Sequence, residues 1–231
     1  MTEIPTRNID QVFHVGSLDV QSRTTRASLE GPCLSISLHP DEWGQIARIG
    51  GPVWELTSPG AVWFDAVNVG DDLAAEMESW AIQEGLAEEA TLWRSWFFDG
   101  ESDDWSYMIC DSREKAEYEA DEEIDEDIGA PTDDGTAVDS LPGLRLTDAG
   151  MAHLERWSEP MDGEAGLMIL YPMLVLAPQM PDLAGVWWEE YENPAALSCP
   201  RGGIFSDRLD NFEIRDPDGN APSFREELPS P

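Results

Sequence analysis

An excess of acidic side chains is the feature that most constrains how this chain can fold. Its 231 residues include 48 aspartates and glutamates but 13 lysines and arginines, so the formal net charge is −35. Twelve of the basic residues are arginines, and Lys115 is the single lysine. Such a charge opposes compaction in dilute buffer, whereas salt shortens the Debye length from about 10 Å at 0.1 M to about 3 Å at 1 M. The composition indicates adaptation to a very salty cytoplasm, or a high-GC genome with an acidic bias.

The same composition excludes several classes of function. Nucleic acids and anionic membranes are bound through lysine and arginine clusters, so we expect direct binding to neither. No apolar run is long enough for a membrane-spanning helix, and the N-terminus lacks the pattern of a signal peptide, so we expect a cytoplasmic protein. The three cysteines, Cys33, Cys110 and Cys199, form no CxxC pair, and the three histidines lack metal-ligand spacing. We therefore expect no metal site.

Hydrophobic periodicity predicts a mixed α+β chain. The segments that alternate or carry short apolar runs are predicted strands, at residues 9–16, 33–38, 53–56, 61–64, 185–191 and 202–205. Helical spacing predicts three helices. The first begins at His39 and Pro40, the second covers residues 70–90, and the third covers residues 146–157 with Thr147 as its N-cap. Residues 91–110 fit a strand or a helix. The apolar residues 166–171 and 173–176 predict a strand that is broken at Pro172.

A dense acidic run interrupts this pattern in the middle of the chain. Eight carboxylates fall within residues 117–127, and a segment rich in glycine, proline and aspartate follows. Such a run is typical of a helix end that leads into a solvated loop. In the alternative interpretation, the run is a surface that binds the basic surface of a partner protein.

Several short motifs occur in an order that resembles the ADP-ribosyltransferase-like superfamily. They are residues 13–17 (FHVGS), 34–37 (LSIS) with His39 and Pro40, the strand pair at 53–56 and 62–64, residues 185–190 (GVWWEE), and 201–205 (RGGIF). Members open with a strand carrying arginine or histidine before glycine or threonine, and a late strand ends in a catalytic acid. This chain has no clear tyrosine on the central strand, and its acid is a glutamate pair.

The resemblance implies a split β-sheet core formed by residues 1–66 and 183–215, with a helical and acidic insertion at 67–182 and a flexible tail at 216–231. It implies an enzyme that uses NAD as substrate and transfers ADP-ribose to a macromolecular target, in a toxin, phage or defence setting.

The resemblance also assigns roles to particular residues. Glu189 or Glu190 would place negative charge beside the oxocarbenium-like transition state. The two acids point to opposite faces of a strand, each beside a tryptophan, so the spacing does not choose between them. The residues assigned to NAD are His14, Gly16, Ser35 and Ser37.

Each of these residues also has an ordinary structural interpretation. The glutamates could end a strand in solvent, His14 could be satisfied by a backbone carbonyl, and the serines could form a solvent-facing strand surface. The tryptophans that could stack on a flat ligand could instead fill the core. The competing function is that of a non-catalytic acidic protein, either an antitoxin or a nucleic-acid mimic. Residues 117–127 would form its binding surface.

Overall fold

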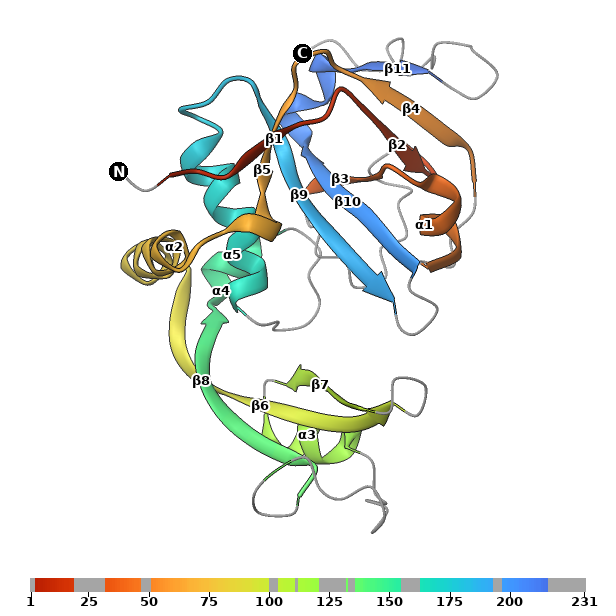
Figure 1. Cartoon of the computed structure of the whole chain (residues 1–231). Coiled ribbons are helices and arrows are strands. Elements are labelled where there is room, and N and C mark those ends of the chain that lie inside the picture. The colour runs from red at the N-terminus through yellow and green to blue at the C-terminus, as the bar shows by residue number, and fades with distance from the viewer. Residues whose placement is uncertain are drawn as a thin grey trace. The chain divides into compact units, whose positions relative to one another are not determined.

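The computed structural model describes residues 3–18, 32–46, 51–99, 104–110, 112–120, 132, 136–154, 163–192 and 197–215. It confirms the α+β class, with a mixed eight-stranded sheet and a separate three-stranded antiparallel sheet (Figure 1). The chain forms two compact units, one from residues 1–73 and 172–231 and the other from residues 74–171. The second unit lies within the predicted insertion at 67–182. The predicted tail at 216–231 lies outside the described residues.

The first unit contains the large sheet, whose strand order is β1-β5-β9-β10-β3-β2-β4-β11. Its strands are β1 (Thr6–Asn8), β2 (Gln11–Val15), β3 (Cys33–Ser37), β4 (Val53–Thr57), β5 (Val62–Asp65), β9 (Leu183–Glu192), β10 (Leu197–Phe205) and β11 (Glu213–Arg215). Its helical segments are α1 (Pro40–Ile46), the 3₁₀ turns η1 (Ala66–Asn68) and η3 (Ser206–Asn211), and the π-helical turn η2 (Pro172–Leu176). These elements confirm the strands predicted at both ends of the chain and the helix predicted at Pro40.

The N-terminal strand takes part in this sheet twice and thereby closes it. β1 pairs with β5, and after Ile9 and Asp10 the chain continues as β2, which pairs with β4 and β3. β5 pairs in parallel with β9, and antiparallel pairing then connects β9 to β10 and β10 to β3. The strands β2, β3, β10, β9 and β5 therefore follow one another in a ring, which the covalent link between β1 and β2 completes (Figure 1).

Asp10 fixes the corner at which the N-terminal strand changes partners. Its carbonyl oxygen accepts the Ser58 N–H at 2.8 Å, and its side-chain Oδ1 accepts the Gly60 N–H at 2.8 Å. Both donors belong to the turn between β4 and β5, where proline and glycine at positions 59 and 60 favour a reversal. Asp10 thereby joins the corner of the N-terminal strand to the turn between β4 and β5.

Two tryptophans fill the interior of the ring. Trp63 on β5 and Trp187 on β9 are fully buried, and their ring centroids lie 6.1 Å apart at 76°. Trp63 also packs 6.1 Å from Phe212 and donates its Nε1–H to the carbonyl of Ile9 at 3.0 Å. Edge-to-face aromatic pairs are favourable beyond the area that they bury. Trp63 and Trp187 are therefore core residues.

The second unit is built on the three-stranded sheet, in the order β7-β6-β8. Its elements are β6 (Ala87–Asp99), β7 (Asp104–Cys110), α3 (Arg113–Glu119), β8 (Val138–Leu146), α4 (Asp148–His153) and α5 (Gly163–Tyr171). The described residues of the segment at 91–110, which fitted either class of structure, belong to strands β6 and β7. Thr147 is the N-cap of α4 as predicted, because its Oγ1 accepts the Gly150 N–H at 3.2 Å.

The prediction of a strand at residues 166–171 and 173–176 is wrong, because these residues form α5 and η2. Their sequence is apolar at almost every position, and such a run has no period that separates a buried strand from a buried helix. Tertiary packing decides the outcome. α5 lies against β8, with Gly163 close to Leu144 and Gly166 close to Leu146.

The predicted helix at 70–90 is too long. The helix α2 covers Asp71–Gln83 and begins within the first unit. It is terminated by Gly85, whose φ of 71° lies in the left-handed region that glycine adopts without strain. Leu86 then donates its N–H to the carbonyl of Ala81, and the chain continues as β6.

The closed ring predicts that removal of Trp63 destabilises the first unit. We expect Trp63→Ala to lower the free energy of unfolding by about 3–5 kcal/mol, because a large cavity replaces a fully buried indole. Urea denaturation followed by circular dichroism measures the change. Val67→Ala is the control, since Val67 is 46% exposed and its truncation should cost less than about 0.5 kcal/mol. Equal losses in the two variants would contradict this account of the core.

Candidate functional site

The predicted site residues occupy one sector of the large sheet. His14 lies at the end of β2 with Gly16 just beyond it, the two serines lie on β3, and the two glutamates lie on β9. The strands β2, β3, β10 and β9 are neighbours in that order. Residues that are far apart in the sequence are thus brought onto three strands within a run of four neighbours (Figure 1).

His14 is held by the backbone around it. The side chain is 5% exposed, with Nδ1 2.7 Å from the carbonyl oxygen of Ser35 and Nε2 3.0 Å from that of Ser17. Only the doubly protonated imidazole can donate to both carbonyls, since a neutral ring has one N–H. These contacts match the structural interpretation of His14, and they fasten the end of β2 to β3.

Gly16 is required by the backbone at this point. Its φ is 114°, which L-amino acids with a side chain rarely adopt. Its N–H donates to the carbonyl of Pro52 at 2.9 Å, and its own carbonyl accepts the indole N–H of Trp54 at 2.8 Å. The segment after β2 is therefore fixed against β4, beside the imidazole of His14.

The serine face of β3 is covered by protein, so the expectation that it meets solvent is wrong. Ser37 is fully buried, and its Oγ accepts the His39 N–H at 2.8 Å ahead of α1. Ser35 is partly buried, and its Oγ accepts a hydrogen bond from Nη2 of Arg201. The reason is that α1 packs over β2, β3 and β10 and covers this face.

Arg201 on β10 is the centre of the site, although the sequence marks it only as an arginine before two glycines. It is 3% exposed, and the ring of Trp43 on α1 lies 3.1 Å from its guanidinium carbon. The ring of Trp188, directly across the β9–β10 pair, lies 5.6 Å away. The planar guanidinium stacks on aromatic faces in a way that an ammonium does not.

Burial also changes the ionisation of this arginine. Desolvation penalises the charged guanidinium and lowers the pKa of Arg201 to about 9. The side chain still carries its positive charge at neutral pH. The sector therefore has a buried cation between two indole rings, bonded to the hydroxyl of Ser35.

The two candidate acids follow directly after this cluster on β9. Glu189 pairs with Pro200 and Glu190 with Cys199, one step along the ladder from the pair of Trp188 with Arg201. Because faces alternate along a strand, position 190 shares the face of Trp188. The side chains of both glutamates lie outside the described part of the structure.

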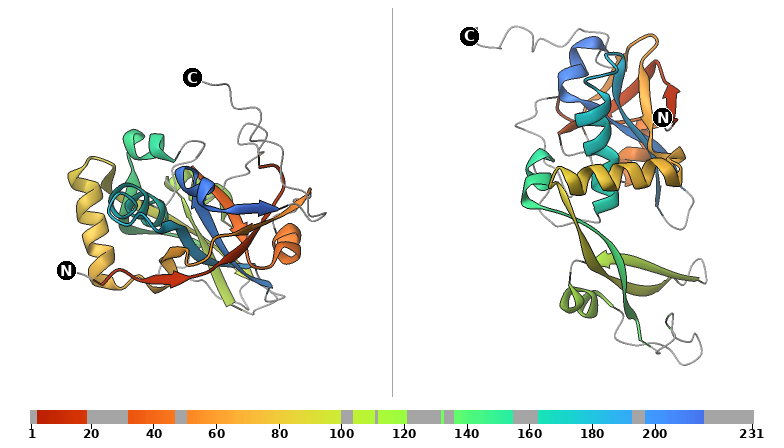
Figure 2. Two further views of the ribbon diagram at one scale, coloured as in Figure 1. Left: turned by 90° about the horizontal axis from the view of Figure 1, so that it is seen from above. Right: turned by 90° about the vertical axis from the view of Figure 1, so that its left-hand side faces the viewer.

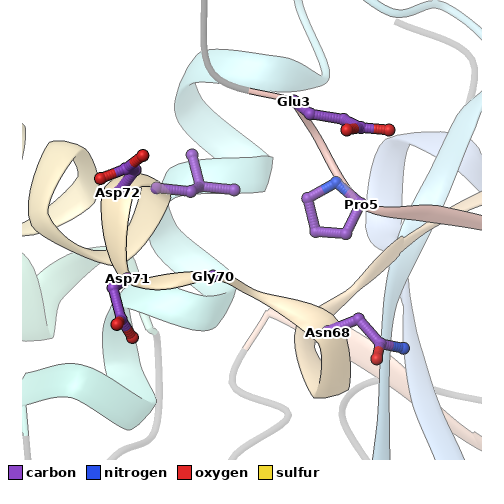
Figure 3. A pocket seen from close by; sticks show the side chains of 7 residues that line it. Glu3, Pro5, Asn68, Gly70, Asp71 and Asp72 are labelled. Atoms are coloured by element: carbon purple, nitrogen blue, oxygen red, sulfur yellow. The ribbon is translucent and has the colours of Figure 1, made fainter.

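A separate hollow of about 590 Å³ lies at the start of α2 (Figure 3). The residues that line it are Glu3, Pro5, Asn68, Gly70, Asp71, Asp72 and Leu73. None of the predicted site residues contributes to it. Its three carboxylates would repel an anionic ligand, so the diphosphate of NAD does not fit here.

Nothing else among the described residues indicates a cofactor site. No group of three or more His, Cys, Asp or Glu side chains there could hold a metal ion. No helix in the described ranges is long and apolar enough to span a membrane. Comparisons with protein-family models, with curated proteins and with solved structures found no match to this chain.

The stacked geometry predicts that lysine cannot replace Arg201. We expect Arg201→Lys to lower the free energy of unfolding by about 1–3 kcal/mol, because the ammonium lacks the planar fork that faces the rings and Ser35. Arg201→Met keeps the bulk and removes the buried charge, so it should lose less. Urea denaturation of the three proteins side by side measures the order. A lysine variant as stable as the parent would refute the role given to the guanidinium plane.

Proposed function

We propose that this chain is an NAD-dependent ADP-ribosyltransferase with an ADP-ribosyltransferase-like fold, acting in the cytoplasm on a macromolecular target. One observation supports this most, namely that the residues the resemblance selects lie on or beside three strands of one sheet, β2, β3 and β9, with β10 alone between β3 and β9. These residues are His14, Gly16, Ser35, Ser37, Glu189 and Glu190. The resemblance adds a toxin, phage or defence setting.

In this proposal the residues on each strand have a different role in catalysis or NAD binding. Glu189 or Glu190 stabilises the positive charge that develops on the ribose as the bond to nicotinamide breaks. The resemblance assigns His14 to NAD; because both of its ring nitrogens contact backbone carbonyls, His14 supports the NAD site in this proposal by fixing the end of β2. The resemblance assigns Ser35 and Ser37 to the nicotinamide pocket; the partly buried Ser35 borders it in this proposal, and the buried Ser37 supports it from beneath α1. The bond from Arg201 to Ser35 links β10 to β3 there.

The first test measures release of nicotinamide from labelled NAD and transfer of label to proteins of a host lysate, in 2 M KCl. We expect turnover by the parent chain and its loss, by about a hundredfold or more, in either Glu189→Gln or Glu190→Gln. The amide has nearly the shape of the carboxylate, so the folded state should be kept. Loss in one variant alone identifies the catalytic acid.

Thermal unfolding of the same proteins, with and without NAD, provides the control. The inactive variant should unfold at the parent's temperature and still be stabilised by NAD, because only the catalytic charge is gone. Absence of turnover in the parent, together with no stabilisation by NAD, would reject the transferase proposal.

The charge distribution favours a second candidate, a non-catalytic acidic protein that binds a basic protein partner. Residues 74–171 contain 27 acidic and 5 basic residues, so this unit carries −22 of the total charge. Glu117 and Glu119, which belong to the predicted binding surface at 117–127, are exposed on α3, whereas residues 121–127 lie outside the described ranges. A partner bound by charge alone should dissociate in molar salt. Binding that survives there would count against an electrostatic mimic.

We also propose that the acidic excess adapts the chain to high salt. The midpoint of thermal unfolding should therefore rise as KCl increases from 0.1 to 2 M, because screening removes self-repulsion from the compact state. Differential scanning fluorimetry measures the midpoint. Sorbitol of equal osmolality is the control, since it does not screen charge. A midpoint that falls with KCl would contradict the adaptation.

A further inference from the structure

The three-stranded sheet of the second unit has two unlike faces. One face carries Trp93, Ser95 and Cys110, and α3 packs against it through Ala116 and Arg113. Figure 2 shows α3 on one side of this sheet. The other face, here called the aromatic face, is formed by Arg94, Trp96, Phe98, Trp105, Tyr107, Ile109, Asp139 and Leu141.

The rings of the aromatic face form two cross-strand pairs. Trp96 lies 4.8 Å from Tyr107, and Phe98 lies 5.5 Å from Trp105, centroid to centroid. These pairs join β6 to β7 at opposed register positions. Tyr107 is 50% exposed, and the other three rings are partly buried. An accessible row of aromatic rings is typical of an interaction surface.

The face is held rigid by one ion pair. Arg94 binds Asp139 through two hydrogen bonds, of 2.9 Å and 2.5 Å, and Trp96 donates its Nε1–H to the same carboxylate at 3.1 Å. The paired arrangement raises the pKa of Arg94, chiefly through its hydrogen bond to Asp139. Rings that are fixed before binding lose little conformational freedom when a partner arrives.

Arg94 also shows what these rings accept. Its guanidinium carbon lies 4.9 Å from the centre of the Trp96 ring and 5.3 Å from that of Tyr107. The negative faces of aromatic rings attract guanidinium groups in this manner. The outer surfaces of the same rings can receive further cations.

The net charge of the second unit also favours a cationic ligand. The unit that carries this face has 27 acidic and 5 basic residues, which is a net charge of −22. Single-stranded nucleic acid also stacks on exposed rings, but its phosphates would be repelled here. A second copy of this acidic chain would be repelled as well.

From these observations we propose that the aromatic face docks an arginine-rich segment of a partner protein. Guanidinium groups of the segment stack on Tyr107 and the neighbouring rings, while the net negative charge of the unit attracts the positive segment. This surface is separate from the proposed transferase site on the first unit and does not depend on that activity. Stacking on rings is less sensitive to salt than charge attraction alone, so the interaction suits molar KCl.

The test measures fluorescence anisotropy of labelled twelve-residue peptides with the full chain in 2 M KCl. The peptides alternate glycine with arginine, with lysine or with glutamate. We expect the arginine peptide to bind most tightly, the lysine peptide more weakly and the glutamate peptide not at all. Equal binding of the arginine and lysine peptides, or any binding of the glutamate peptide, would overturn the proposal.

Two tyrosines provide matched variants. Tyr107→Ser removes a ring from the aromatic face, whereas Tyr118→Ser removes an 84% exposed ring from α3 on the other side of the sheet. We expect Tyr107→Ser to weaken binding of the arginine peptide about two- to fivefold and Tyr118→Ser to leave it unchanged. Thermal unfolding of both variants confirms that they fold. No loss in a folded Tyr107→Ser, or the same loss in both variants, would place the peptide elsewhere and overturn the proposal.

Size-exclusion chromatography of the parent and of Tyr107→Ser tests whether a second copy of the chain covers the aromatic face. A monomer in both cases supports the proposal. A dimer that Tyr107→Ser dissociates would show that a second copy covers the face, and this too would overturn it.

Discussion

The first unit depends on closure of its sheet by a single N-terminal strand. β1 and β2 join strands that would otherwise be far apart in the sheet order, and Asp10 holds the corner between them. β1 covers the outer edge of β5 and β2 connects β3 to β4, and Trp63 and Trp187 fill the core of this sheet. The position of every proposed site residue follows from this ring. His14 lies at the end of the closing strand, and Glu189 and Glu190 lie on the strand that pairs with β5.

Cations in this chain are few, and the structure places four of them, Arg7, Arg94, Arg113 and Arg201, over aromatic rings. Arg201 lies between indole rings beneath α1, and Arg94 lies over the rings of Trp96 and Tyr107. Arginine can be desolvated against an aromatic face at lower cost than lysine, because its charge is spread over a plane. A chain that keeps a single lysine has thus retained the cation that its tryptophans can pack against.

Sequence patterns predicted the individual strands and helices better than they predicted how these elements pack together. Alternation placed β2, β3 and β4 because successive side chains of a strand meet different surroundings. The apolar segment that became α5 could not be assigned, since it lacks a period. The resemblance assigned His14 and Ser35 to the same ligand, and the structure places them in contact. The burial of Arg201 depends on α1 bringing Trp43 over β10, which no local pattern encodes. The pairing of β5 with β9 likewise joins Val62 to Leu183 without a signal in either segment.

This last pairing has a consequence for how the chain is made. The paired positions Val62 and Leu183 are 121 residues apart, so a ribosome that has just added Val62 must add 121 more residues to reach its partner. At the usual rates of translation this delay is roughly 6 to 24 s. During that time the N-terminal strands have an open edge and an uncovered Trp63, while residues 74–171 can already collapse on local contacts. The nascent chain is therefore most exposed to aggregation, and most in need of a chaperone, in its first third.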